Sequence, residues 1–257
     1  MPDLGQLFVD ILPFIAIGFT AQMIDGALGM AFGVTTQTLL VSAMGVPPAS
    51  ASASVHLVEL FTTGASGISH AWRRNVDWGL FRRLVPFGVL GGVTGAYVLS
   101  NINAAAARPF VMLYLTGIGF YLLWRAIRMA RPKFEDPRFI SPLALIGGFL
   151  DASGGGGWGP VVTSNLLIQG GDPRKVIGTV NTSEFLLTLS ISLTFLLTLG
   201  PAAFTLTTGG LIIGGVIAAP FGAILASRVR PRVLLFAVAV VLIATSVYST
   251  SKAWPLI

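Results

Sequence analysis

The sequence predicts an all-α integral membrane protein with two inverted-topology repeats, each holding a glycine-broken or re-entrant helix pair and three full transmembrane helices. Three observations predict this: an apolar composition, successive apolar stretches of membrane-spanning length, and a pattern of aspartate, glycine and proline that occurs twice. Hydrophobic residues make up 54% of the 257 residues and charged residues 10%, whereas soluble domains carry about 25% charged residues. The 31 glycines agree with a helical bundle in a membrane, since small residues allow helices to approach closely in lipid.

Six apolar segments approach the roughly 20 residues that a helix needs to cross a bilayer. They are Ala49–Ala71, Leu84–Leu99, Pro109–Ile127, Val176–Leu199, Leu206–Ala226 and Val233–Ser251. The N-terminus does not resemble a cleaved signal, because Asp3 and Asp10 stand where a basic region is expected. We therefore expect the first apolar run to be retained.

The repeated pattern lies in and just after two regions, Phe8–Gly45 and Ile140–Gly170, each expected to form a broken or re-entrant pair. The first has Asp25, Gly29, Gly33, Gly45 and Pro47, and the second has Asp151, Gly155, Gly159, Gly171 and Pro173 at the same spacing. After a slip of one residue, His56 and Glu59 correspond to Asn181 and Glu184. A duplication explains the pattern, and predicts a first repeat over 1–130, a cytoplasmic linker over 131–138 and a second repeat over 139–257.

Loop charges predict that the two repeats have opposite orientations. The loop 73–83 carries four arginines, whereas its counterpart 200–205 carries no charge. One helix later the bias reverses, because 101–108 holds one arginine and 228–232 holds three. Cytoplasmic loops carry an excess of Lys and Arg, so equivalent loops face opposite sides. The excess of basic residues in cytoplasmic loops therefore explains the net charge of +6. We do not expect binding to nucleic acid.

Four acidic residues fall at membrane depth, where ionisable groups are costly and usually serve a function. They are Asp25, Glu59, Asp151 and Glu184, the candidates for coupling or gating. The aspartates allow two interpretations: they contact the transported species, or they cap a short helix. The glutamates lie in mid-helix, so a coupling or gating role is favoured over an interhelical hydrogen bond.

Neutral groups around the breaks predict an anion site, because glycine runs expose backbone N–H groups and helix N-termini favour negative charge. The candidate substrate-binding residues are Gly29, Gly33, Thr36, His56, Gly154, Gly155, Gly156, Gly157, Trp158, Asn181 and Thr182. His56 either carries a proton or donates to an oxyanion, or is a neutral histidine bonded between helices. Trp158 either walls the cavity or packs on a glycine. His70, beside Arg73, is expected at the interface without a function.

Other classes of function lack their motifs. There is no cysteine, which excludes disulfides and cysteine nucleophiles, and because there are only two histidines we expect no transition-metal centre. The run at 154–157 lacks the Gly-Lys-Ser/Thr ending of a phosphate-binding loop, and neither Gly-x-Ser-x-Gly nor His-Glu-x-x-His occurs. We expect no enzyme activity, no cofactor and no metal.

The two glycine-rich segments also resemble a known family. Residues 18–35 (GFTAQMIDGALGMAFGVT) and 148–163 (GFLDASGGGGWGPVVT) are similar to the paired signatures of the sulfite exporter TauE/SafE family, also called the 4-toluene sulfonate uptake permeases. The similarity covers nearly the whole chain. The first signature departs from the commoner run of glycines, because Leu28, Met30 and Ala31 are interleaved. The resemblance implies transport of sulfite, sulfonates or other small anions across the bacterial inner membrane, often outward.

The leading hypothesis is a multi-pass secondary transporter with alternating access. Its expected partners are a small organic or inorganic sulfur-containing anion, such as sulfite or sulfoacetate, and membrane lipid, with protons as a candidate coupling ion. Export is the direction that the resemblance implies, and the sequence does not indicate an oligomer. The alternatives are a passive anion channel and, from a different class, a membrane-embedded assembly factor for a redox complex.

Overall fold

The computed structural model describes residues 4–28, 30–128, 137–204, 206–228 and 230–253, and these residues form helices and no strand. The first half contains α1 (Leu4–Leu28), α2 (Phe32–Ser42), α3 (Pro48–Trp72), α4 (Trp78–Asn101) and α5 (Ala104–Ile127). The second half contains α6 (Ile140–Gly154), the π-helix η1 (Trp158–Thr163), α7 (Ser164–Ile168), α8 (Pro173–Leu199), the 3₁₀ turn η2 (Pro201–Ala203), α9 (Leu206–Arg228) and α10 (Pro231–Ala253). Each of the six predicted spans lies within one helix, which confirms the all-helical class.

Local sequence explains where several of these helices begin. Asp77 accepts hydrogen bonds from the N–H groups of Gly79 and Leu80 at the start of α4. Asn103 and Asp172 cap α5 and α8 in the same manner. Such side chains satisfy N–H groups that have no partner within the helix, so these caps fix the helix boundaries in the connecting loops.

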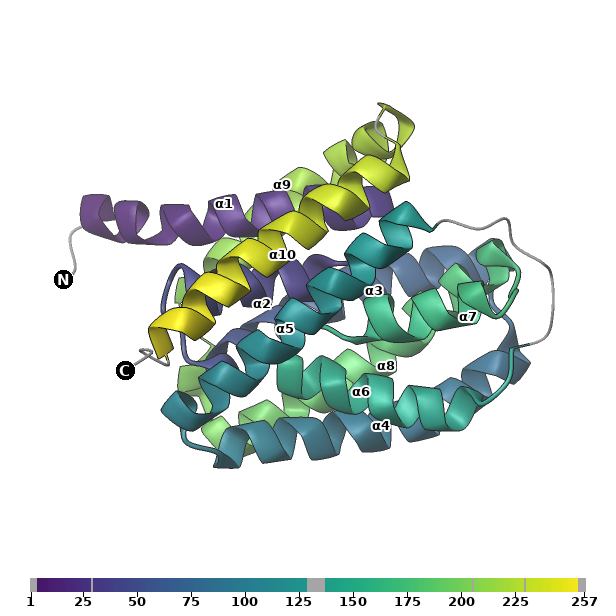
Figure 1. Ribbon diagram of the computed structural model, residues 1–257, viewed down its shortest axis with the longest axis horizontal. Coiled ribbons are helices and arrows are strands. Elements are labelled where there is room, and N and C mark those ends of the chain that lie inside the picture. The colour runs from purple at the N-terminus through teal and green to yellow at the C-terminus, as the bar shows by residue number, and fades with distance from the viewer. Residues whose placement is uncertain (1–3, 29, 129–136, 205, 229, 254–257) are drawn as a thin grey trace.

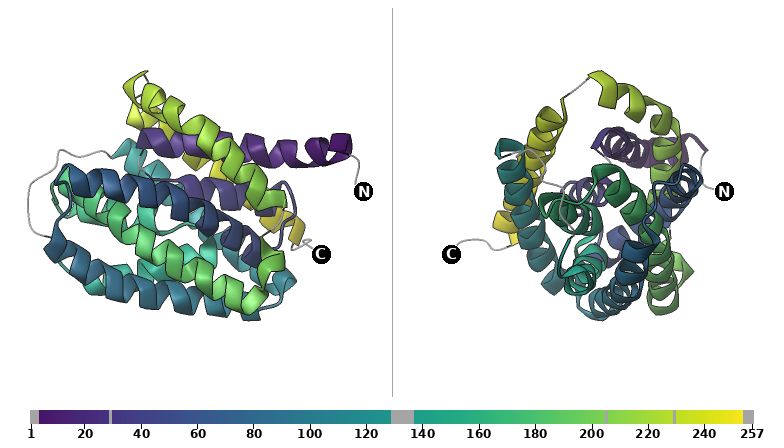
Figure 2. Two further views of the ribbon diagram at one scale, coloured as in Figure 1. Left: turned by 180° about the vertical axis from the view of Figure 1, so that it is seen from behind. Right: turned by 90° about the vertical axis from the view of Figure 1, so that its right-hand side faces the viewer.

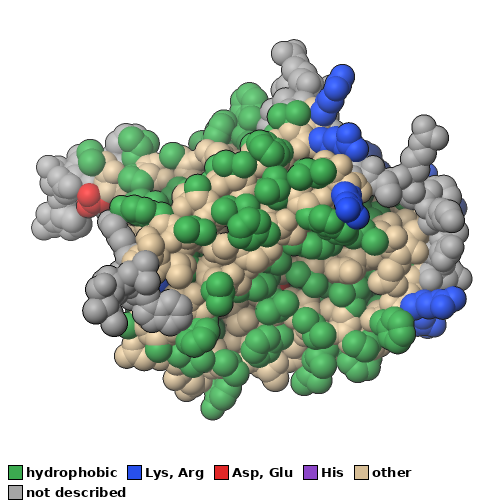
Figure 3. Space-filling view, in the orientation of Figure 1, with side chains coloured by type: hydrophobic (Ala, Val, Ile, Leu, Met, Phe, Trp, Pro, Cys, Tyr) green, Lys and Arg blue, Asp and Glu red, His purple; other side chains and the backbone are tan. Residues whose placement is uncertain are grey.

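The outer surface is suited to lipid. Within the described segments, four helices are long and apolar enough to cross a membrane, namely Trp78–Asn101, Ala104–Ile127, Pro173–Leu199 and Arg232–Ser251. Large apolar side chains such as Leu113, Phe120 and Leu197 are exposed on the outside of the bundle, and Figure 3 shows a broad apolar face with prominent Lys and Arg side chains gathered toward one end. An apolar surface of this extent is typical of a membrane protein.

That end of the bundle is called the basic end below. There the connection between α3 and α4 meets the start of α8: Arg174 Nε donates to Asn75 Oδ1 at 2.6 Å, and Lys175 Nζ donates to the Arg74 carbonyl at 2.9 Å. The basic side chains of two loops, one from each half, therefore lie together. By the positive-inside rule, this end is the one expected in the cytoplasm.

Both predicted breaks are present. The first separates α1 from α2 and includes Ala31 at φ 114°, and the second separates α6 from η1 and includes Gly155 at φ 74° and Gly156 at φ 151°. The halves differ in detail, because α1 has 25 residues and α6 has 15, and because the regular α2 is matched by a π-helix followed by the short α7. A π-helix inside a helical segment often marks a functional site.

Equivalent helices of the two halves pack against each other. Helix α3 runs antiparallel to α8, since Gly64 and Gly67 lie against Phe185 and Thr182 while Gly178 lies against Asn75. Helix α5 pairs with α10, and the crossed pairs α1 with α9 and α6 with α4 complete the bundle (Figures 1 and 2). Antiparallel packing of equivalent helices agrees with an inverted relation, although orientation in a membrane and the limits of the halves stay predictions. Most of the expected linker 131–138 lies outside the described residues.

Glycines allow the close helix contacts, as their small-xxx-small spacing suggests. A Cβ atom on Gly91 of α4 would lie 2.1 Å from the Leu145 carbonyl oxygen of α6, and one on Gly148 would lie 2.2 Å from the Gly88 carbonyl oxygen. Because backbone atoms stand there, a side chain cannot be accommodated by a change of rotamer. The spacing of α4 and α6 therefore depends on these glycines.

We predict that Gly91→Ala destabilises the protein by about 1–3 kcal/mol, the usual cost of overpacking. The matched control is Gly117→Ala on α5, where an added Cβ meets nothing within 4 Å, and where alanine gains about 0.5–1 kcal/mol over glycine in a helix. Thermal unfolding in detergent should show a lower melting temperature for the first variant and an equal or higher one for the second. Equal melting temperatures for the two variants would contradict the packing argument.

Candidate functional site

A cavity of about 270 Å³ lies between the two breaks and helices α3 and α8. Its walls contain the same positions from both halves. The equivalent pairs are Asp25 and Asp151, Met30 and Gly156, Ala31 and Gly157, Gly33 and Gly159, Val34 and Pro160, and Glu59 and Glu184. The duplicated pattern in the sequence therefore converges on one central space, with each half contributing one break and one glutamate.

The two breaks touch each other at the cavity wall. A Cβ atom on Gly156 would lie 2.3 Å from the Val34 nitrogen, and one on Gly33 would lie 2.8 Å from the Gly155 carbonyl oxygen. Only glycine permits backbones to approach this closely. The glycines that line the cavity thus bring the starts of α2 and η1 together.

The aspartates hold the second helix of each break. Asp25 Oδ1 accepts a hydrogen bond from the Phe32 N–H at 3.2 Å, and Asp151 Oδ1 accepts from the equivalent Trp158 N–H at 2.8 Å and from the Gly157 N–H at 2.6 Å. Each aspartate therefore caps the helix that follows it and also borders the cavity. Both interpretations of these residues, cap and contact with the transported species, fit this position.

The two aspartates differ in the number of hydrogen-bond partners that their carboxyl oxygens have. Asp151 is 2% exposed, and its Oδ2 atom lies 3.1 Å from His56 Nε2, so both its oxygens have partners. Asp25 makes its single side-chain hydrogen bond to Phe32, within the described part of the chain. The N-terminus of α2 is consequently the less fully capped of the two, and its Gly33 and Val34 backbones line the cavity.

The glutamates line the cavity from two helices that pack against each other. Glu59 lies on α3 and Glu184 on α8, and Glu59 is 7% exposed. Its Oε2 atom is buried and has no hydrogen-bond partner among the described residues, while its Oε1 atom lies beside Gly33. A buried carboxyl oxygen without a partner is costly, so this group is available to a ligand or a proton.

The cavity is acidic for a site expected to hold an anion. Its described lining includes four carboxyl groups and no Lys or Arg side chain. No group of three or more His, Asp or Glu residues in the described segments is arranged to hold a metal ion. Positive potential comes instead from the N-termini of α2 and η1, which both begin at the cavity wall.

Some predicted substrate-binding residues line this cavity and others do not. Gly33, Gly156, Gly157 and Asn181 line it, together with all four predicted coupling residues. Gly29 lies outside the described residues. Thr36 is fully buried and its hydroxyl lacks a partner among the described groups, but it is not in the cavity wall. Thr182 donates to the Gly178 carbonyl at 2.7 Å and faces Gly67, so it too lies outside the wall.

The other glycines of the second break serve packing. A Cβ atom on Gly154 would lie 2.1 Å from Tyr114 Cε1, and one on Gly155 would lie 2.2 Å from Gln37 Cδ. Gly155 also ends α6 in the left-handed conformation. Neither residue lines the cavity, which is bordered by the next two glycines.

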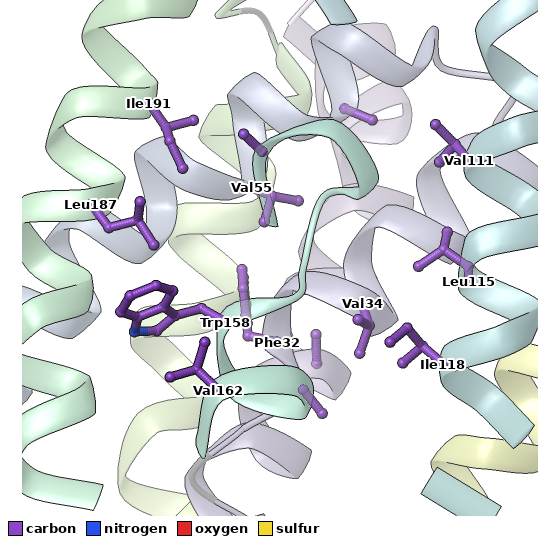
Figure 4. Close-up of a cluster of buried hydrophobic side chains, with 14 of the residues drawn as sticks. Phe32, Val34, Val55, Val111, Leu115, Ile118, Trp158, Val162, Leu187 and Ile191 are labelled. Carbon is purple, nitrogen blue, oxygen red and sulfur yellow. The ribbon is translucent and has the colours of Figure 1, made fainter. Parts of the chain in front are cut away.

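Trp158 takes the second of its two predicted positions. Its ring lies against Gly88, where an added Cβ would be 2.5 Å from Cη2, and its Nε1 donates to the Val180 carbonyl at 3.3 Å. Figure 4 shows the ring beside Leu187 and Val162 in the buried cluster. The side chain is fully buried and does not line the cavity.

His56 is fully buried behind the cavity wall. In addition to its contact with Asp151, its Nδ1 atom lies 2.7 Å from the Ser52 carbonyl oxygen. The ring therefore bridges α3 to the second break. Of the interpretations left open by the sequence, this geometry is that of a histidine bonded between helices.

Several lining residues were not selected from the sequence. Thr62, Thr63, Ser66 and His70 line the cavity along α3 beyond Glu59, with Gln22, Met30, Phe32 and Ile177 from other elements. The polar residues at 59, 62, 63, 66 and 70 follow helical spacing and share one face, a signal that could have identified them. His70, expected at the interface without a function, lies at the mouth of the cavity as well as near the basic end.

Comparisons with known proteins agree with this architecture. Residues 14–249 match the family described as "Sulfite exporter TauE/SafE". The chain is 44% identical over 232 residues to the "Probable membrane transporter protein YtnM" of Bacillus subtilis (strain 168), which covers 87% of this chain and 77% of that protein. No solved structure matches the chain at a significant level. With the match extending over both breaks and the helices around the cavity, the chain belongs to the TauE/SafE family of membrane transporters.

Proposed function

We propose that this protein is a secondary transporter that exports small sulfur-containing anions, such as sulfite or sulfonates like sulfoacetate, by alternating access with proton coupling. The observation that carries the proposal is the central cavity, to which both halves contribute a helix N-terminus, a glycine-lined backbone and two carboxyls. Discontinuous helices of inverted repeats form such sites near the bilayer midplane. The matched family is described as a sulfite exporter, which supports the substrate class.

The anion is expected to bind at the start of α2. The N-terminal N–H groups of a helix attract negative charge, and Asp25 occupies only the Phe32 N–H of this turn. The following residues, Gly33 and Val34, have their backbones in the cavity wall. The Gly33 N–H faces the Glu59 carboxyl, so a small oxyanion that takes the place of this carboxyl can accept its hydrogen bond without a buried arginine.

Proton coupling follows from the charge of the lining. A dianion among ionised carboxylates would be repelled strongly at low dielectric, and the described lining carries no basic side chain except that of His70 at the mouth. One proton bound by the pair Glu59 and Glu184 lowers this repulsion, so the anion binds together with a proton. The two glutamates therefore act as the coupling groups, and the proton accompanies the anion.

The same stoichiometry accounts for export. A dianion that moves with one proton carries one net negative charge. The membrane potential, negative inside, is worth about 2.3 kcal/mol per charge for each 100 mV. It therefore drives the complex outward even though a proton accompanies it. A bacterium could lower its internal sulfite concentration in this manner without hydrolysing ATP.

Transport by the purified protein in proteoliposomes tests the function. We expect saturable uptake of labelled sulfite or sulfoacetate and acceleration by unlabelled anion on the opposite side, because a carrier exposes one site alternately to each side. Flux that rises linearly with concentration, without counterflow, would indicate a passive channel. Absence of flux for any small anion would contradict the proposal and favour the assembly-factor alternative.

A second prediction concerns the coupling carboxyls. With one proton per anion, a gradient of about one pH unit supports about tenfold accumulation, since one unit corresponds to about 1.36 kcal/mol. Glu59→Gln and Glu184→Gln keep the shape of the side chain without an exchangeable proton, so the coupling should be lost. We expect each variant to retain counterflow and to lose accumulation driven by the pH gradient.

The control is Asp77→Asn, which also removes one carboxylate, but at the exposed start of α4 and outside the cavity. Asparagine is as good a helix cap as aspartate, so this variant should accumulate the anion like the parent protein. Glutamine variants that still accumulate the anion in response to the pH gradient would exclude these residues as coupling groups.

A further inference from the structure

The cavity opens toward one end only. From Glu59 its wall follows α3 through Thr62, Ser66 and His70, and this helix ends at Trp72, next to the basic residues that meet the start of α8. Across from it, α8 contributes Ile177, Asn181 and Glu184, the part of that helix nearest its N-terminus. Access to the cavity is therefore from the basic end.

Beyond Glu59 in the other direction, the equivalent space is closed. His56 is fully buried with Nε2 3.1 Å from Asp151 Oδ2, and one turn earlier Ser52 Oγ donates to the Ala152 carbonyl at 2.7 Å. The His56 ring also lies 6.4 Å from that of Phe195. Helix α3 is thus joined to the second break on this side.

The closed side is also filled by apolar side chains. On α8 the positions that correspond to Thr62, Ser66 and His70 of α3 are Leu187, Ile191 and Phe195. These three side chains are at most 1% exposed. Equivalent faces of the two helices therefore differ: the face of α3 lines an open cavity, and the face of α8 is buried by packing.

The corresponding contact at the open side is absent. Asn181 is the counterpart of His56, and Asp25 is the counterpart of Asp151. Asn181 and Asp25 both line the cavity, but Asn181 Nδ2 donates to the Ile177 carbonyl at 3.0 Å, and Asp25 accepts from the Phe32 N–H. Each half therefore has a residue able to reach across to the aspartate of the other half, and one of the two contacts is made.

We propose that His56 and Asn181 are alternating gate residues, and that the structure is the state open at the basic end. In the opposite state the contact between His56 and Asp151 is broken, and the Asn181 amide donates to the Asp25 carboxyl. The gate rests on the proposed function, because a gate requires two access states. It assigns His56 and Asn181 to gating in place of the substrate binding expected from the sequence. The contact of His56 with Asp151 is formed, whereas Asn181 and Asp25 bond to other groups, so this pair favours the state described here.

The chain contains no cysteine. Single cysteines can therefore be introduced as reporters of the gate without first replacing native cysteines. Ser66→Cys reports the open side and Ile191→Cys reports the equivalent position of the closed side. In proteoliposomes, a membrane-impermeant thiol reagent at the basic end should label the first and not the second. The same reagent applied from the opposite end should label neither position as long as His56 and Asn181 are unchanged.

Exchange of the gate residues should reverse this pattern. In His56→Asn/Asn181→His the histidine faces Asp25, so Ser66→Cys should become protected by about fivefold or more, the lower range of ordinary coupling between sites. Ile191→Cys should become reactive from the opposite end. The matched control is Asn101→His, at the exposed end of α4, which should leave both labelling rates unchanged.

Unchanged labelling in the exchanged variant, with the protein monodisperse in detergent, would overturn the gate. If that variant does not fold, His56→Asn alone serves, because it makes the two gates alike and should lower the labelling of Ser66→Cys. An unchanged rate there would overturn the gate as well. Labelling needs no substrate, so failure of the gate and failure to transport an anion are seen in separate measurements.

Discussion

The architecture depends on how two interrupted helices are stabilised inside an apolar bundle. Backbone N–H groups at a helix start have no partner within the helix, and in a bilayer no water replaces one. Asp25 and Asp151 supply the missing acceptors at equivalent positions, Phe32 and Trp158. The carboxyl groups come from the preceding helix of each pair, so each aspartate also joins the two arms of its break. Without this contact, the N–H groups of Phe32 and Trp158 would lack an acceptor.

The other features of the site follow from the two breaks. Because the starts of α2 and η1 approach each other through Gly33 and Gly156, two helix dipoles point their positive ends into one cavity. The same approach places the carboxyls that hold the breaks beside that cavity, and Glu59 and Glu184 add two more. Such a site provides backbone N–H donors for an anion and carboxyl groups for protons, which is the reason for proposing that the two species are coupled.

The sequence predicts much of this and misses what depends on tertiary packing. Spacing of aspartate and glycine locates both breaks, because interruption of a membrane helix needs those residue types, and all four acidic residues at depth line the cavity. It cannot decide how a helix is rotated. His56 was selected and His70 set aside, yet His70 lines the mouth and His56 is bonded behind the wall. Trp158 likewise packs on Gly88, a contact 70 residues away in the chain.

The repeated sequence is compatible with two access states, whereas the structure shows one of them. Equivalent residues would have equivalent surroundings if the halves were identical in conformation, but Ser66 borders open space while its counterpart Ile191 is buried. Identical halves would populate the two opposite states equally, so a preference for one state comes from positions where the halves differ. His56 and Asn181 are such a pair, each placed one turn before the coupling glutamate of its helix. The proposed gate differs between the halves and so would bias one state, while the aspartates and glutamates common to both halves would keep both states available.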